Sequence, residues 1–166
     1  MIERIIERSK KRNIAIELDE TDEDNYVTFM VGDECYGVDV GRVSEVVGLD
    51  DITFLPNMKS YMKGLKNLRG EIIPLIDLNL RFGLAEKEYD KLTSIIVTEI
   101  KDKSIGLIVD SVLNVVNLPE SEMQNTPHFS DNVEIDCISG VGKMEDVIVI
   151  ILNVDKIFTD EELENI

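Results

Sequence analysis

The pattern of glycines and branched apolar residues in residues 26–83 recurs in residues 93–159, and this internal duplication limits the possible folds more than any other feature. One set of matched positions consists of Gly37, Val38, Val40, Val43, Val46, Val47 and Leu49 against Gly106, Leu107, Val109, Val112, Val115, Val116 and Leu118. A second set consists of Leu65, Ile72, Ile73, Leu75, Leu78 and Phe82 against Val141, Ile148, Val149, Ile151, Val154 and Phe158. Two similar halves predict two similar structural units, with a cleft where the units meet.

Each half is built from short apolar segments that are separated by turn residues. Residues 26–31 and 35–40 flank a Gly-Asp-Glu turn, and residues 93–100 and 104–110 flank a Lys-Asp-Lys turn, so each pair predicts a β-hairpin. Short strands at regular spacing with such turns are typical of all-β barrels or sandwiches. We therefore expect an all-β fold with two small barrels. The sequence leaves open whether strands are exchanged between them.

Residues 62–78 form two apolar runs around the turn Asn-Leu-Arg-Gly. Gly70 can supply the positive φ that a tight reversal needs. The run after it is apolar on both faces as far as Ile76, which predicts a strand covered on both sides. Pro74 cannot donate a ladder hydrogen bond, which favours an edge position or a bulge. Arg69 is then a charged group at a rigid turn, and this placement suits binding to another protein.

The two ends of the chain depart from the strand pattern. Residues 2–12 place three isoleucines at helical spacing before a Lys-Lys-Arg patch, and residues 19–25 are an acidic run typical of a solvated linker. We expect a partly helical tail over residues 1–25, either docked or loose, and a domain over residues 26–166. A C-terminal helix is predicted where residues 153–158 are followed by the mostly acidic residues 160–164.

Composition excludes several classes of partner. The net charge of −17 disfavours binding to nucleic acid and to anionic membrane surfaces. The N-terminus has no apolar signal region, and no run approaches the roughly 20 apolar residues that span a membrane. Cys35 and Cys137 are expected to be buried free thiols, which favours a cytoplasmic protein.

Catalytic chemistry finds no support in the sequence. No Cys or His cluster has metal-ligand spacing, and there is neither a phosphate-binding glycine loop nor a Gly-x-Ser-x-Gly elbow. His128 stands alone in a polar loop and is expected to be a surface residue. Asp39, Asp77 and Asp110 lie at strand ends, where turn and cap roles are expected. An acidic hydrolase or a metal-dependent enzyme is the enzymatic alternative, but no carboxylate pair is singled out. We expect no enzymatic activity, no cofactor and no metal site.

The segment from Gly64 to Leu78 closely resembles the signature of the CheW-type chemotaxis coupling proteins. Residues 26–47, 104–116 and 140–158 are similar to that family's successive blocks, so the resemblance covers nearly the whole domain. It implies two SH3-like five-stranded β-barrel subdomains with short helices, and a non-enzymatic scaffold.

The resemblance also implies partners and contact residues. Family members couple the cytoplasmic tips of methyl-accepting chemoreceptors to the regulatory domain of the histidine kinase CheA. A CheW-like scaffold in another receptor–kinase array, for pilus motility or gene regulation, is the alternative. Contacts are expected at Arg69, Val43, Glu45, Gly64, Gly106, Val112 and Val115. From the sequence alone, Val43 and Val112 suit a core and an interface equally well.

Overall fold

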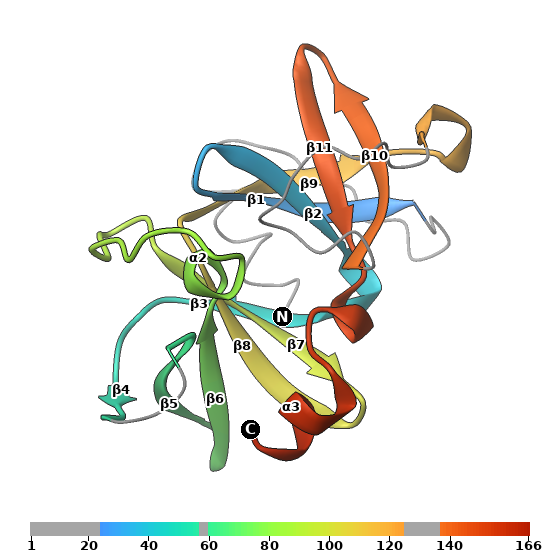
Figure 1. The fold of residues 1–166 in the computed structure, drawn as a ribbon. Coiled ribbons are helices and arrows are strands. Elements are labelled where there is room, and N and C mark those ends of the chain that lie inside the picture. Colours follow the sequence, from blue (N-terminus) through green and yellow to red (C-terminus); the bar gives the residue numbers. More distant parts are fainter. Residues whose placement is uncertain (1–23, 57–59, 125–136) are drawn as a thin grey trace.

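The computed structural model describes residues 24–56, 60–124 and 137–166, and their strands form two β-sheets (Figure 1). One, called here the β1–β2 sheet, has the order β10-β11-β2-β1-β9. The other, the β7–β8 sheet, has the order β3-β7-β8-β6-β5-β4. Predictions for the N-terminal tail and for His128 fall outside the described residues.

The strands follow the predicted hairpins closely. The β1–β2 sheet contains β1 (Asn25–Val31), β2 (Glu34–Asp39), β9 (Ser111–Asn117), β10 (Ile138–Met144) and β11 (Val147–Leu152). The β7–β8 sheet contains β3 (Val43–Val47), β4 (Ile52–Phe54), β5 (Met62–Leu68), β6 (Glu71–Asp77), β7 (Ser94–Ile100) and β8 (Lys103–Val109). This sheet has six strands rather than the expected five, because the short β4 pairs with β5. Two SH3-like subdomains describe the fold.

The two repeat halves exchange their first hairpins. β1 and β2 pair with β9 and β11 of the second half, while β7 and β8 pair with β3 and β6 of the first. The exchange is reciprocal down to single residues, since Gly37 lies opposite Ile151 and the matched Gly106 lies opposite Leu75. Neither sheet is therefore made from one half alone, and the question that the sequence left open is settled in favour of exchange.

Each sheet curls so that its edges approach one another. Gln124, beyond the β9 edge, forms a β-bridge with Val141 on the opposite edge strand β10. In the other sheet, Arg69 at the β5–β6 turn contacts Glu45 on the opposite edge strand β3. These contacts give each sheet the curvature of a small barrel.

Burial divides the apolar residues among three clusters. The strands of the β7–β8 sheet enclose one small core, Val47, Ile73, Leu75, Ile95, Val97 and Ile108. The β1–β2 sheet and the loop after β9 enclose another, Cys35, Val116, Leu118, Val149 and Ile151. Val47, Ile73 and Leu75 have matched counterparts in the second core. A third and larger cluster includes residues of both sheets and of the helices, and it joins the two units.

Proline and glycine explain two details of β6 and the segment after it. Pro74 predicted an edge position or a bulge. β6 is an interior strand, so the edge position is wrong for the strand as a whole, whereas the pairing of β5 with β6 does shift register next to Pro74, opposite Leu75 and Ile76. The pairing of β6 with β8 begins only at Leu75, however, so Pro74 precedes the ladder that it could not have joined. The short helix α2 (Leu78–Arg81) follows, and Gly83, at φ +78°, turns the chain away from it.

The C-terminal helix is present as α3 (Asp160–Glu164), beside the β7–β8 sheet in Figure 1. Thr159 caps it by accepting a hydrogen bond from the Glu162 backbone N–H, and the Glu162 carboxylate accepts one from the Thr159 N–H. Glu162 also accepts hydrogen bonds from Arg81 and from the Tyr61 hydroxyl. The helix is thereby fastened to α2 and to the start of β5.

Candidate protein-interaction site

Arg69 occupies the tight turn between β5 and β6. It adopts a left-handed conformation, φ +53°, and Gly70 follows at φ +86°. Its side chain is 80% exposed. The matched turn in the second half contains Glu145 at φ +54°, so the same backbone forms with the opposite charge. The turn geometry therefore does not require arginine at this position.

Arg69 and Glu45 are both predicted contact residues, and the fold brings them together. The Arg69 Nη2 donates a hydrogen bond to Glu45 Oε2 at 3.0 Å. The Glu45 side chain is only 11% exposed, whereas the guanidinium lies in solvent. The nearly buried carboxylate thus holds one edge of the guanidinium, and its remaining N–H groups are directed to the surroundings.

The predicted contact valines lie deeper than the arginine. Val43 and Val112 occupy equivalent positions at the starts of β3 and β9, and they are 6% and 7% exposed. Both belong to the large core cluster, so in the free chain their role is packing. Val115 is half-buried and packs against the same cluster.

The two predicted contact glycines are buried where chains pass closely. A Cβ on Gly64 would lie 2.3 Å from the carbonyl oxygen of Thr53 on β4. A Cβ on Gly106 would lie 2.6 Å from a methyl group of Leu75. Substitution of Gly64 would therefore disturb the pairing of β4 with β5, and substitution of Gly106 would crowd the side chains of Leu75 and Ile95. Effects on binding at either position would follow from the altered fold.

The sequence interpretation missed exposed apolar side chains beside the turns. Ile72 is 66% exposed, although its run was predicted to be covered on both sides. Val147 and its neighbour Ile148, the position matched to Ile72, are also exposed. The duplication could have indicated this exposure. In both halves the turn projects from its barrel, so the first residues of the strand that follows the turn are left uncovered.

The strand-end aspartates have the predicted turn and cap roles. Asp77 caps α2, and Asp39 accepts a hydrogen bond from the Gly41 N–H. Asp110, between β8 and β9, accepts hydrogen bonds from the Gly32 N–H and from side chains of α2 and the loop beyond it. Burial, together with a hydrogen bond to Asp77, raises the pKa of Tyr89.

No group of three potential metal ligands occurs among residues 24–56, 60–124 and 137–166. Within the same residues, no helix has the length and apolarity to span a membrane. The expected cleft between units corresponds to a hollow of about 470 Å³ between the β1–β2 turn and residues 79–87. None of the predicted contact residues lines this hollow.

Comparison with known proteins gives a consistent family. The CheW-like domain model matches residues 25–162. The chain is 31% identical to the "Chemotaxis protein CheW" of Klebsiella aerogenes, over 87% of each chain. "Protein PilI" of Pseudomonas aeruginosa is 32% identical over a shorter region, 56% of this chain and 52% of that protein.

A solved structure supports the same assignment. It is described as the crystal structure of the scaffolding protein TtCheW from Thermoanaerobacter tengcongensis, and it superimposes with a TM-score of 0.76 at 32% identity. The match covers 87% of this chain and 94% of that one. The duplicated halves, the exchanged hairpins and the Arg-Gly turn are therefore features of a chain that belongs to the CheW-like domain family of non-enzymatic chemotaxis scaffolds.

Proposed function

We propose that this protein is a cytoplasmic adaptor that couples methyl-accepting chemoreceptors to the histidine kinase CheA. Membership of the CheW-like domain family supports the proposal, as does the similarity to named chemotaxis proteins. The observation that carries it in this chain is the Arg69 guanidinium, exposed at a turn and oriented by the nearly buried Glu45. A charged group held in this way can recognise a carboxylate or carbonyl with little loss of side-chain entropy.

The two barrel ends suit an adaptor that must bind more than one partner. Exposed Ile72 lies near Arg69 in one unit, and exposed Val147 and Ile148 lie beside Glu145 in the other. Apolar area supplies binding energy, and the charged neighbours differ between the two ends. The ends are therefore similar in shape and different in charge, as recognition of two different partner surfaces requires. We assign Val43, Gly64, Gly106, Val112 and Val115 supporting roles, in which they shape the fold beneath the contact surface.

The test is receptor-dependent stimulation of CheA autophosphorylation, measured with and without this protein. We expect stimulation only when protein, receptor and kinase are all present. An unchanged rate would contradict the proposal.

Arg69→Ala should weaken this stimulation and leave the melting temperature close to that of wild type. The ion pair is largely exposed on the arginine side, and such pairs contribute about 0–1 kcal/mol to stability. Lys91→Ala, which removes another exposed cation, is the control for net charge. A large fall in melting temperature without a separate coupling defect would make Arg69 a structural residue instead.

A scaffold role in another receptor–kinase array, such as one for pilus motility or gene regulation, is the second candidate. The similarity to "Protein PilI" supports this second candidate. Purification of the native complex and identification of its kinase and receptor distinguish the two roles.

A further inference from the structure

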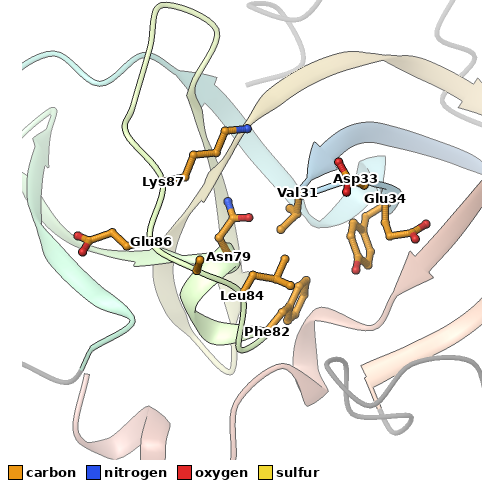
Figure 2. A pocket seen from close by; sticks show the side chains of 11 residues that line it. Val31, Asp33, Glu34, Asn79, Phe82, Leu84, Glu86 and Lys87 are labelled. Carbon is orange, nitrogen blue, oxygen red and sulfur yellow. The ribbon is translucent and has the colours of Figure 1, made fainter.

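A hollow separate from the Arg69 turn lies where the two units meet. It lies between the β1–β2 turn and the segment that follows α2, and its volume is about 470 Å³. Figure 2 shows Val31, Phe82 and Leu84 gathered around its centre, with Asp33 and Glu34 on the hairpin side. None of the residues assigned to receptor or kinase contacts lines it.

The lining combines an apolar floor with an acidic rim. Val31 and Phe82 are buried, while Leu84 is only half-buried and can cover an incoming side chain. Asp33 and Glu34 are exposed, and neither forms an ion pair with another described residue. An apolar floor beside two uncompensated carboxylates suits a segment that carries both aliphatic and basic side chains.

The other charged groups of the lining are already paired. Lys87 donates a hydrogen bond to Asp110 at 3.1 Å, and Glu86 accepts one from Lys63 at 2.6 Å. The negative charge available to a ligand is therefore concentrated on the hairpin side, at Asp33 and Glu34.

The chain itself contains a segment with this chemistry. Residues 1–12 contain five basic and two acidic residues, a net charge of +3. Because the whole chain carries −17, residues 13–166 carry −20, and the charge is strongly divided between the two parts. Ile2, Ile5 and Ile6 have the spacing of one helical face.

The position of β1 allows this segment to reach the hollow. β1 runs from Asn25 to Val31, a rise of about 20 Å, and Val31 lies in the lining. Residues 13–24 can span up to about 40 Å when extended, which is enough to return along β1. The connection is short, so the effective concentration of the segment at the hollow is high.

We propose that residues 2–12 bind in this hollow, with the isoleucines against Leu84 and the basic side chains facing Asp33 and Glu34. The same acidic and apolar lining would accept the equivalent segment of a second copy, and the experiment separates these two sources.

The test uses paramagnetic broadening in the full-length chain. Ala85→Cys places a nitroxide label in the lining at an exposed, uncharged position, and the native Cys35 and Cys137 are buried. Glu71→Cys places the same label at an exposed position at the start of β6, the end of that strand that is opposite to α2 and the hollow, and serves as the control. We expect loss of amide signal intensity from residues 2–12 with the Ala85→Cys label and retained intensity with the Glu71→Cys label. Equal intensity with both labels would overturn the proposal.

Two further measurements test whether the bound segment comes from the same chain or from a second copy, and whether the acidic rim recognises it. In a mixture of isotope-labelled chains without nitroxide and unlabelled chains with it, broadening of residues 2–12 would show that a second copy fills the hollow and would overturn intramolecular binding. The double variant Asp33→Lys/Glu34→Lys should restore signal intensity, whereas Glu120→Lys/Glu122→Lys, an equal charge change at another exposed site, should not. Broadening that survives reversal of the rim would overturn the charge-based recognition.

Discussion

At the scale of single residues, Arg69 and Glu145 show that one turn geometry forms with side chains of opposite charge. Their φ angles are +53° and +54°, yet one side chain is a cation and the other an anion. Left-handed backbone costs a non-glycine residue free energy, and both turns accept that cost. The geometry of the turn therefore does not account for arginine at position 69, which supports the binding role proposed for its side chain.

Gly70 should tolerate only residues that adopt a left-handed backbone. Its φ is +86°, and a Cβ would meet no atom within 4 Å, so the cost of substitution comes from the backbone alone. Gly70→Val should lower the free energy of unfolding by about 1–2 kcal/mol, since β-branched residues are the least tolerant of positive φ. Gly70→Asn should cost less. Chemical denaturation measures both, and equal losses would contradict the backbone explanation.

Substitution of Gly64 should destabilise the fold for a different reason, which is the lack of room for a side chain. A Cβ there would lie 2.3 Å from the Thr53 carbonyl oxygen, so Gly64→Ala must displace β4 from β5. Overpacking of this kind costs about 1–3 kcal/mol. Gly48→Ala is the matched control, because its Cβ would have no neighbour closer than 3.9 Å. Equal melting temperatures for the two variants would show that β4 can move away from β5 without loss of stability.

At the scale of elements, short helical turns join one sheet to the other and are fixed by ion pairs. Arg42, in η1 (Val40–Arg42) between β2 and β3, donates hydrogen bonds to both carboxylate oxygens of Asp155 at 2.7 and 2.6 Å. It also donates one to the Glu99 carbonyl of β7. Asp155 lies in η4 (Val154–Lys156), which follows β11. One guanidinium thus joins two crossing segments to the β7–β8 sheet.

The Arg42–Asp155 contact should make stability depend on acidity. Hydrogen bonds from Arg42, partly opposed by desolvation, lower the pKa of Asp155 below its ordinary value of 3.8. A carboxyl group whose pKa is lowered by folding stabilises the fold above its ordinary pKa, and this contribution is lost as the pH falls through the folded-state value. The side chain is 41% exposed, so the effect should be modest.

Melting temperature against pH measures this contribution. The wild-type curve should lie above that of Asp155→Asn at neutral pH, and the two should converge below about pH 4, where the carboxyl group of the unfolded chain is protonated. Parallel curves over the whole range would contradict the linkage.

At the scale of the whole molecule, Asp110 holds the two units against each other. It lies where the chain passes from β8 to β9, and so from one sheet to the other. Its carboxylate accepts hydrogen bonds from the Gly32 N–H at 2.9 Å and from Asn79 Nδ2 at 2.7 Å. These donors come from the β1–β2 turn and from α2, on opposite sides of the junction.

Asp110→Ala should loosen this junction. The Gly32 N–H and the Asn79 amide would lose their partner, and the unsatisfied amide of the buried Asn79 costs about 1–3 kcal/mol. Amide hydrogen exchange should speed up in the β1–β2 turn and in α2 more than within β7 and β8. Asp146→Ala, at an exposed turn, is the control. Uniform acceleration across all strands would indicate general destabilisation rather than loosening of the junction.

Much of this organisation was predictable because strands and turns are encoded locally. Alternating apolar runs and Gly-containing turns determined the hairpins, and the duplication determined that there are two similar units. The capping role of Asp77 also followed from its place at a strand end. The length and distinctive residues of the segment from Gly64 to Leu78 were enough to indicate the family.

The sequence alone determined which segments become strands, where they turn and that a charged residue, Arg69, stands at the β5–β6 turn. Tertiary structure alone decided that the first hairpins are exchanged, that Val43 and Val112 are buried, and that Glu45 orients the arginine. The reason is physical: matched halves present nearly identical strand edges, so local preferences cannot select the partner strand. Only packing of the whole chain can make that selection, through the large core that both sheets share.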